Sequence, residues 1–117
     1  MLKLKALKPA LREKKRYIVY QLESADNKTL KMFNYQQELV KKLQELLGVF
    51  NAAQAGILPL KIDNEKQRGI IRVNHTAVDQ IRSCFVLIDE LNKTPLRVST
   101  RGVSGIMKKA KEKYLCS

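Results

Sequence analysis

The residues with the clearest chemical potential are the lysines and arginines near the two ends of the chain. Residues 1–16 hold seven basic side chains and one acidic, and residues 97–117 hold six basic and one acidic. The stretch between them is nearly neutral, although the whole chain carries a formal net charge of +12. Self-repulsion destabilises a compact state, whereas each phosphate contact releases condensed counterions. We therefore interpret this placement as a device for binding nucleic acid, because a need for general solubility would not sort the charge toward the termini.

The candidate phosphate-binding residues lie in three stretches, at residues 14–16, 97–105 and 108–111. A Gly/Ser loop at residues 102–105 precedes a predicted helix, so its backbone N–H groups could hold a phosphate, with an ordinary serine N-cap as the alternative. Arg68 and Arg72 could join this set, but plain surface charge is the favoured interpretation for both. The candidate RNA-binding residues are Lys14, Lys15, Arg16, Arg97, Arg101, Gly102, Ser104, Gly105, Lys108, Lys109 and Lys111.

The sequence offers no catalytic constellation. The single histidine, His75, lies at a predicted strand-to-helix junction, where a hydrogen-bonded boundary residue is the expected role. Asp89 and Glu90 are neighbours on a predicted helix, so their side chains diverge. Asp63 and Glu65 flank a predicted hairpin turn and are expected to be solvated. We predict that the protein has no active site of its own.

The cysteines do not fit a metal site either. A structural zinc site needs four Cys or His ligands, and this chain has two cysteines and one histidine. Cys84 lies in an apolar run and is expected to be a buried small hydrophobe, while Cys116 is penultimate. No apolar run approaches the roughly 20 residues of a membrane helix. The expected location is the cytoplasm, with no metal bound to the protein.

Hydrophobic periodicity indicates four strands and three helices. The first strand places Ile18, Tyr20 and Leu22 on its apolar face. Gly48 is the expected stop of the first helix, and Pro59 requires an edge position or a bulge in the second strand. The predicted elements are strand 16–23, a helix capped by Asn34, strand 55–63, strand 68–74, a helix capped by Thr76 and reaching Ile88, strand 96–100, and a helix over 104–114.

This order, β-α-β-β-α-β plus a C-terminal helix, predicts an α+β fold of the ferredoxin-like split βαβ type. We expect a basic N-terminal arm at residues 1–15 and a single sandwich domain at residues 16–117. Two helices should cover one face of a four-stranded sheet. We also expect the first and fourth strands not to be adjacent, which would spread the basic surface broadly.

The fold alone does not assign a function. An RNA recognition motif stacks bases on aromatic side chains of its first and third strands, and the predicted third strand has none. An acyl-phosphate hydrolase on this scaffold would need an arginine after the first strand, and none is present there. A regulatory or protein-protein assembly module remains the alternative to RNA binding. It is favoured by the very apolar second helix, whose Val86 and Leu87 are the candidate protein interface, with a thicker core as the other explanation.

Three strings, in this order, resemble the family of ribonuclease P protein component 2, the small subunit of archaeal ribonuclease P with a eukaryotic counterpart. They are LREKKRYI at residues 11–18, RGIIR at residues 68–72 and VSGIMKKAK at residues 103–111. The resemblance runs from about Leu11 to Leu115. It departs from the family at Ile106, where a threonine is expected after Ser-Gly, and Ile106 is expected to pack instead.

The resemblance implies a non-catalytic subunit that supports a catalytic RNA in removing the 5′ leader of precursor tRNA. The RNA would hold the Mg²⁺ ions, and the protein would need no cofactor. The implied partners are ribonuclease P RNA, nearby precursor tRNA and a second ribonuclease P protein subunit of barrel-like fold. The resemblance also implies a homodimer within a two-plus-two assembly. The lack of a long apolar run, in turn, predicts no membrane partner.

Overall fold

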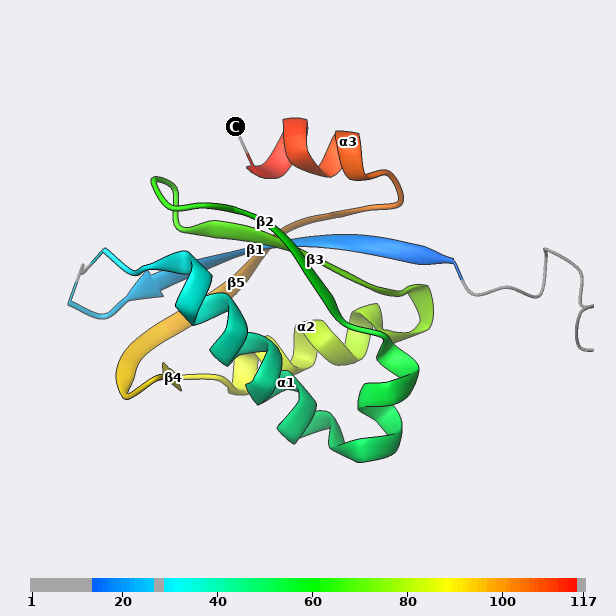
Figure 1. The fold of residues 1–117 in the computed structure, drawn as a ribbon, viewed down its shortest axis with the longest axis horizontal. Helices are drawn as coiled ribbons and strands as arrows, with labels where there is room; N and C mark the ends of the chain where they lie inside the picture. Colours follow the sequence, from blue (N-terminus) through cyan, green and yellow to red (C-terminus); the bar gives the residue numbers. More distant parts are fainter. Residues whose placement is uncertain (1–13, 27–28, 116–117) are drawn as a thin grey trace, which may run out of the picture.

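The computed structural model describes residues 14–26 and 29–115 (Figure 1). Most of the N-terminal arm predicted at residues 1–15 therefore lies outside the described residues. In chain order the elements are β1 (Lys15–Ser24), α1 (Met32–Ala55), β2 (Leu58–Asp63), β3 (Arg68–Asn74), the 3₁₀ turn η3 (His75–Ala77), α2 (Val78–Leu87), β4 (Glu90–Leu91), β5 (Thr94–Ser104), α3 (Met107–Ala110) and the π-helical turn η4 (Lys111–Leu115). No helix in these ranges is long and apolar enough to cross a bilayer.

The strands form one antiparallel sheet in the order β2-β3-β1-β5-β4, which confirms the ferredoxin-like α+β fold. The short strand β4 is an addition, and it pairs only with the start of β5. The expectation that the first and last long strands are not adjacent is wrong. The crossover through α2 lands β5 directly against β1, where Tyr17 lies opposite Ser104.

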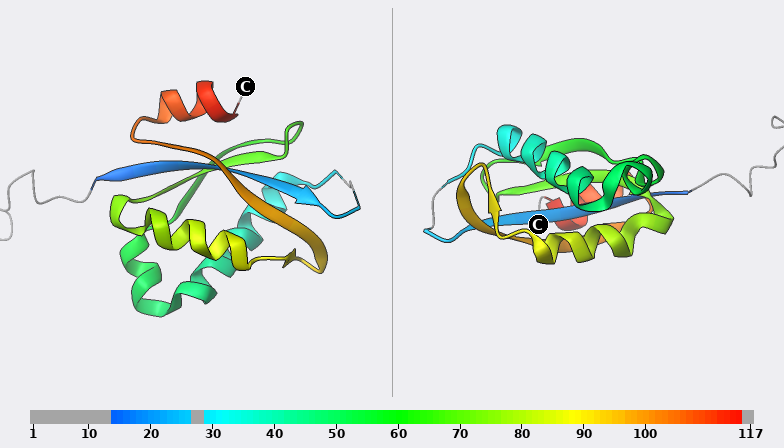
Figure 2. Two further views of the ribbon diagram at one scale, coloured as in Figure 1. Left: turned by 180° about the vertical axis from the view of Figure 1, so that it is seen from behind. Right: turned by 90° about the horizontal axis from the view of Figure 1, so that it is seen from below.

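The main core lies between the sheet and the two long helices, which cover the same face (Figures 1 and 2). The predicted face of β1 is confirmed, since Ile18, Tyr20 and Leu22 are all buried. Ile81 and Phe85 of α2 pack against them. Each fully buried side chain of this size contributes about 1.5–3 kcal/mol.

The opposite face of the sheet carries a second, smaller core beneath the C-terminal turns (Figure 1). Val19 of β1 and Ile70 of β3 meet Ala110 and Leu115 there, and all four are buried. An RNA recognition motif would stack bases on this face of its first and third strands. The C-terminal segment occupies that place, which agrees with the lack of an aromatic platform in the sequence.

The predicted start and stop of α1 are both wrong in detail. The helix begins at Met32 rather than after Asn34, and the Oδ1 of Asn64 accepts the backbone N–H of Met32 at 3.0 Å. Gly48, at φ +84°, breaks the helical geometry, but the helix resumes and runs to Ala55. Gly56, at φ +58°, then terminates it in the left-handed conformation. The cap is thus supplied by a turn far away in sequence, which local pattern reading does not detect.

The second half of the chain also departs from the predicted bounds. No side chain caps η3 or α2, so Thr76 is not the predicted cap. Helix α2 ends at Leu87, so Asp89 and Glu90 lie beyond it, with Glu90 in β4. The edge position of Pro59 is confirmed, because β2 ends the sheet and its register shifts between Pro59 and Ile62.

Strand β5 is longer than predicted and continues through most of the expected Gly/Ser loop. Tyr20 pairs with Thr100 and Val19 with Gly102, so Arg101 is the extra residue of a β-bulge. The final helix begins at Met107 instead of Ser104. Buried Ala110 and half-buried Met107 and Tyr114 pack against the sheet.

Candidate nucleic-acid interface

The first candidate residues, Lys14 to Arg16, stand at the start of β1, where the main chain is held firmly. The backbone N–H of His75 donates to the carbonyl of Lys14 at 2.7 Å, and Nδ1 of His75 lies 3.2 Å from the backbone nitrogen of Lys14. This confirms His75 as a hydrogen-bonded boundary residue. The ammonium of Lys15 donates to Asn74, and Nη1 of Arg16 donates to the carbonyl of Lys15 at 2.9 Å.

The start of β1 lies beside the end of β5, so the two basic parts of the sequence meet. Tyr17 pairs with Ser104, and a Cβ added to Gly105 would lie 3.5 Å from Nη1 of Arg16. The exposed Lys108 and Lys109 follow within one helical turn. Segments about 90 residues apart in sequence thus share one end of the molecule (Figure 1). We call Lys14, Lys15, Arg16, Arg72, Lys108 and Lys109 the basic end.

Gly102 and Ser104 have structural tasks in this region. A Cβ on Gly102 would lie 2.3 Å from the Tyr114 ring, so only glycine lets the C-terminal turns sit this close to the sheet. The hydroxyl of Ser104 bonds both the N–H and the carbonyl of Ile106, each at 3.1 Å. Both residues belong to β5, and α3, with only four residues, begins after them. RNA contact by Gly102, Ser104 and Gly105 stays a prediction.

Arg68 and Arg72 are half-buried on the outer face of the sheet, so plain surface charge, the favoured interpretation, is wrong for both. Nη1 of Arg68 donates to the carbonyl of Tyr114 at 2.9 Å and so holds the C-terminal turn. Arg72 is paired in register with Tyr17, next to the basic end, and its buried Nε has no hydrogen-bond partner among the described residues. The alternation of RGIIR, with Ile71 turned to the core, was the signal that both arginines share the opposite face.

Among the remaining predicted residues, Arg97 and Arg101 are not brought to the basic end. Arg97 lies opposite Glu23, about 23 Å along β1 from Arg16 at the usual rise per residue. Its Nη2 is 3.5 Å from Oε2 of Glu23, a solvent-exposed ion pair. Arg101 occupies the bulge between these two places, and exposed Lys111 begins η4.

The candidate protein-interface residues are on the surface. Val86 and Leu87, at the end of α2, are 83% and 68% exposed, so they are not part of a thicker core within the described residues. Cys84, one turn earlier, is buried as predicted, and burial raises the pKa of its thiol. Ile106 is 54% exposed, so the expectation that it packs is wrong. No group of three or more His, Cys, Asp or Glu side chains that could hold a metal occurs in the described part of the chain.

A comparison with models of protein families identifies the family of this chain. The model of the Rpp14/Pop5 family matches residues 16–115. The chain belongs to the Rpp14/Pop5 family. The match covers every described element from β1 to η4, so the resemblance based on three short strings is confirmed over nearly the whole chain.

Proteins named ribonuclease P protein component 2 are similar to this chain over most of their length. The ribonuclease P protein component 2 of Thermococcus gammatolerans is 34% identical over 111 residues, which cover 95% of this chain and 91% of that protein. The protein of the same name from Pyrococcus horikoshii is 35% identical over 116 residues, covering 98% and 94%. A chain in the cryo-EM structure of yeast ribonuclease MRP matches with a TM-score of 0.57 at 25% identity, covering 84% of this chain and 78% of that chain.

Proposed function

We propose that this protein is the RNA-binding protein component 2 of a ribonuclease P. In that role it supports a catalytic RNA that removes the 5′ leader of precursor tRNA in the cytoplasm. The observation that carries the proposal is similarity to proteins named ribonuclease P protein component 2 over 95% of this chain. The basic end supplies the chemistry that such a subunit needs, because it joins cations from both ends of the sequence.

The basic end binds phosphate mainly through charge. Exposed Lys14, Lys108 and Lys109 are mobile point charges that can follow an RNA backbone. Arg72 is held more rigidly in the sheet, and its planar guanidinium can address one phosphate with two donors. The arrangement fixes where RNA sits without reading its bases, as backbone contacts do in general.

The chemical step belongs to the RNA in this proposal. His75 is engaged at the start of β1, and Asp63 caps the turn after β2 by accepting the N–H groups of Glu65 and Lys66. The described carboxylates do not converge on one metal position. The Mg²⁺ ions of the reaction would therefore be held by the RNA partner, and the protein would stabilise the RNA that positions them.

Salt dependence of RNA binding tests the proposal directly. If about six phosphates are neutralised, the logarithm of the association constant should fall with the logarithm of salt concentration at a slope of about −4 to −5. The measurement is fluorescence anisotropy of labelled ribonuclease P RNA titrated with the protein at several potassium chloride concentrations. A flat salt response would refute phosphate-dominated binding.

Protein partners follow from the same proposal. A second ribonuclease P protein subunit of barrel-like fold would contact the exposed Val86 and Leu87, and the pair would double into a two-plus-two assembly around a homodimer. Precursor tRNA would pass near the complex. The support for this part is the exposure of two large apolar side chains at the end of α2.

The alternative function, a protein-protein assembly module, rests on the same exposed side chains. Affinity purification before and after complete nuclease digestion separates the two. Partners that depart with the RNA favour the ribonucleoprotein role, whereas partners that remain bound favour the assembly module. In a ribonuclease P, RNA and at least one protein should be recovered before digestion.

A further inference from the structure

The outer edge of β5 is open beyond its short pairing with β4. Strand β4 reaches only Thr94 and Pro95, and the backbone N–H of Leu96 donates to the carbonyl of Asp89 at 3.0 Å. On the other side of β1, the N–H of Leu22 donates to the carbonyl of Gln67 at 2.9 Å. Because hydrogen-bonded and non-hydrogen-bonded pairs alternate in an antiparallel ladder, Leu22 cannot also bond its opposite residue on β5.

That opposite residue is Val98, and Tyr20 likewise faces Thr100. The N–H and C=O groups of Val98 and Thr100 therefore point away from β1, toward the free edge, in phase with the N–H of Leu96. No strand of the described chain pairs with them. A row of such groups is a template for another extended backbone.

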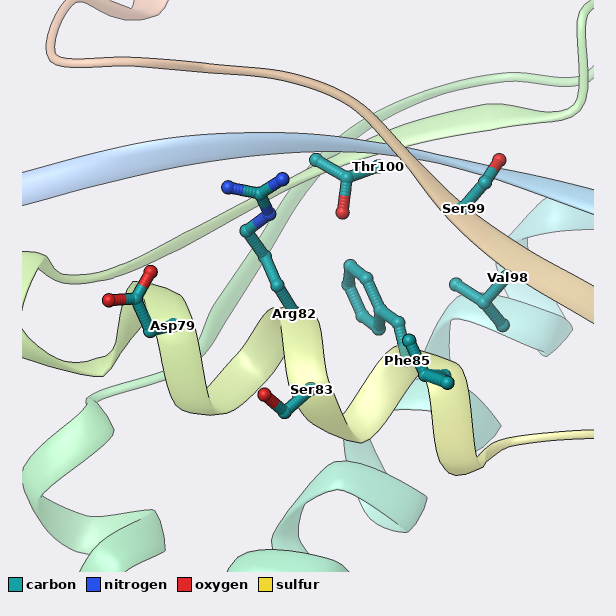
Figure 3. A pocket seen from close by; sticks show the side chains of 8 residues that line it. Asp79, Arg82, Ser83, Phe85, Val98, Ser99 and Thr100 are labelled. Carbon is teal, nitrogen blue, oxygen red and sulfur yellow. The ribbon is translucent and has the colours of Figure 1, made fainter.

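A groove runs alongside this edge, between β5 and α2 (Figure 3). Its volume is about 590 Å³, and Val98, Ser99 and Thr100 form one wall while Phe85 and Val86 belong to the other. The Phe85 ring points up between the helix and the strand, and the Arg82 side chain rises from α2 toward Thr100. A strand added to β5 would therefore place alternate side chains over an apolar floor.

The charges around the groove select the occupant. Arg82 lines the groove on the α2 side, exposed Arg101 lies in the β5 bulge outside the lining, and neither makes an ion pair among the described residues. Arg97 has only its exposed contact with Glu23. Asp79 is the one acidic residue in the lining, at the far end of α2. The apolar side chains of an incoming strand would enter the groove, and the alternate side chains on its other face would lie beside Arg97 and Arg101, which favours acidic residues there.

We propose that the β5 edge and its groove bind an extended acidic peptide segment of a partner protein by strand addition. The free backbone groups of Val98 and Thr100 supply the hydrogen bonds, the groove takes small apolar side chains, and carboxylates on the other face of the added strand pair with Arg97 and Arg101. This surface is separate from the basic end and does not depend on how that end binds RNA.

Two occupants from this chain itself fit poorly. Residues 1–13 carry four basic side chains and one acidic, so the arginines would repel them. A second copy pairing through the same edge, antiparallel about Ser99, would bring Arg97 of one copy against Arg101 of the other. Like charges directly opposite destabilise a strand pair.

The test uses the full-length protein and a synthetic peptide of about eight residues that alternates glutamate and valine. At about 1 mM peptide, the amide hydrogen exchange of Val98 and Thr100, followed by NMR, should slow by at least about tenfold. A peptide N-methylated on alternate residues, which cannot donate along one edge, and a lysine-valine peptide should both fail to protect these amides.

Charge reversal supplies the matched control. Arg101→Glu should weaken peptide binding at least about fivefold, whereas Lys61→Glu, an equal change of net charge on the opposite edge strand, should change it less than about twofold. Equal effects of the two variants would overturn the proposal. So would protection by the N-methylated peptide, protection at β2 instead of β5, or protection produced by a single-stranded RNA or by raising the protein concentration alone.

Discussion

Gly69 and Tyr20 show how tightly single residues are constrained in this fold. The Tyr20 ring is completely buried, and its hydroxyl lies over the backbone of Gly69, where a Cβ would be only 2.3 Å from the hydroxyl oxygen. Glycine is thus required in β3 for lack of space, although its backbone has no special conformation. The hydroxyl has no close hydrogen-bond partner among the described residues, and the Gln36 side chain is its polar neighbour.

Gly69→Ala should therefore lower the free energy of unfolding by at least about 2 kcal/mol, since overpacking a rigid core has costs of this size. Gly105→Ala is the matched control, because its Cβ would meet only Arg16 at 3.5 Å, an ordinary contact. Urea denaturation followed by circular dichroism measures both. Equal losses for the two variants would show that the close approach seen at Gly69 is not rigid.

Tyr20 also predicts a pH dependence of stability. Burial raises the pKa of Tyr20 above its ordinary value, so the folded state holds the proton while the unfolded state releases it from about pH 10. The unfolded state then binds fewer protons, and stability must fall as pH rises beyond that value, by up to about 1.4 kcal/mol per pH unit. Below pH 9 this contribution is fully present.

The check is to measure urea midpoints of the wild type and Tyr20→Phe from about pH 8 to pH 11. Tyr20→Phe removes a buried hydroxyl that has no close hydrogen-bond partner among the described residues, so it should be neutral or slightly stabilising at pH 8. Above pH 10 it should lose stability less steeply than the wild type. Parallel curves would mean that Tyr20 ionises as freely in the folded protein as in the unfolded chain.

At the scale of elements, the C-terminal turns depend on Gly102. Tyr114 lies against this glycine, Arg68 holds the carbonyl of Tyr114, and Ala110 covers Val19. Gly102→Ala should push the Tyr114 ring away and loosen α3 and η4, at a cost of about 1–3 kcal/mol. Methyl NMR should then report a changed environment for Val19 and Ile70 while Leu39, on the other face of the sheet, keeps its signal. A uniform change across both faces would refute this local role.

The elements also show where sequence reading succeeds and where it fails. The bounds of β3 and the buried face of β1 follow from alternation within a few residues, and both are confirmed. The start of α1 depends on Asn64, 32 residues away, and the extension of β5 depends on pairing with β1 through a bulge. Such long-range contacts leave no local periodicity, which is why those bounds were missed.

At the scale of the whole molecule, charge at the two ends of the sequence does gather in space for the described residues. Arg16 lies beside Gly105, and α3 begins two residues later. The sequence predicted that both charged ends bind nucleic acid but not which residues come together, because Arg97 belongs to the far end of β1 and half-buried Arg72 belongs to the near end. Which arginines join the basic end is decided by strand register, and register is a property of the assembled sheet.

The most direct measurement is the RNA affinity of two alanine variants with equal loss of charge. One replaces Lys14, Lys15 and Arg16 in the basic end, and the other replaces the exposed Lys31, Lys41 and Lys93 elsewhere on the surface. With thermal unfolding nearly unchanged in both, the first should weaken binding to ribonuclease P RNA at least about tenfold and reduce the salt slope by about 2, whereas the second should weaken binding less than about threefold. Equal losses of affinity would show that net charge, and not the basic end, binds the RNA.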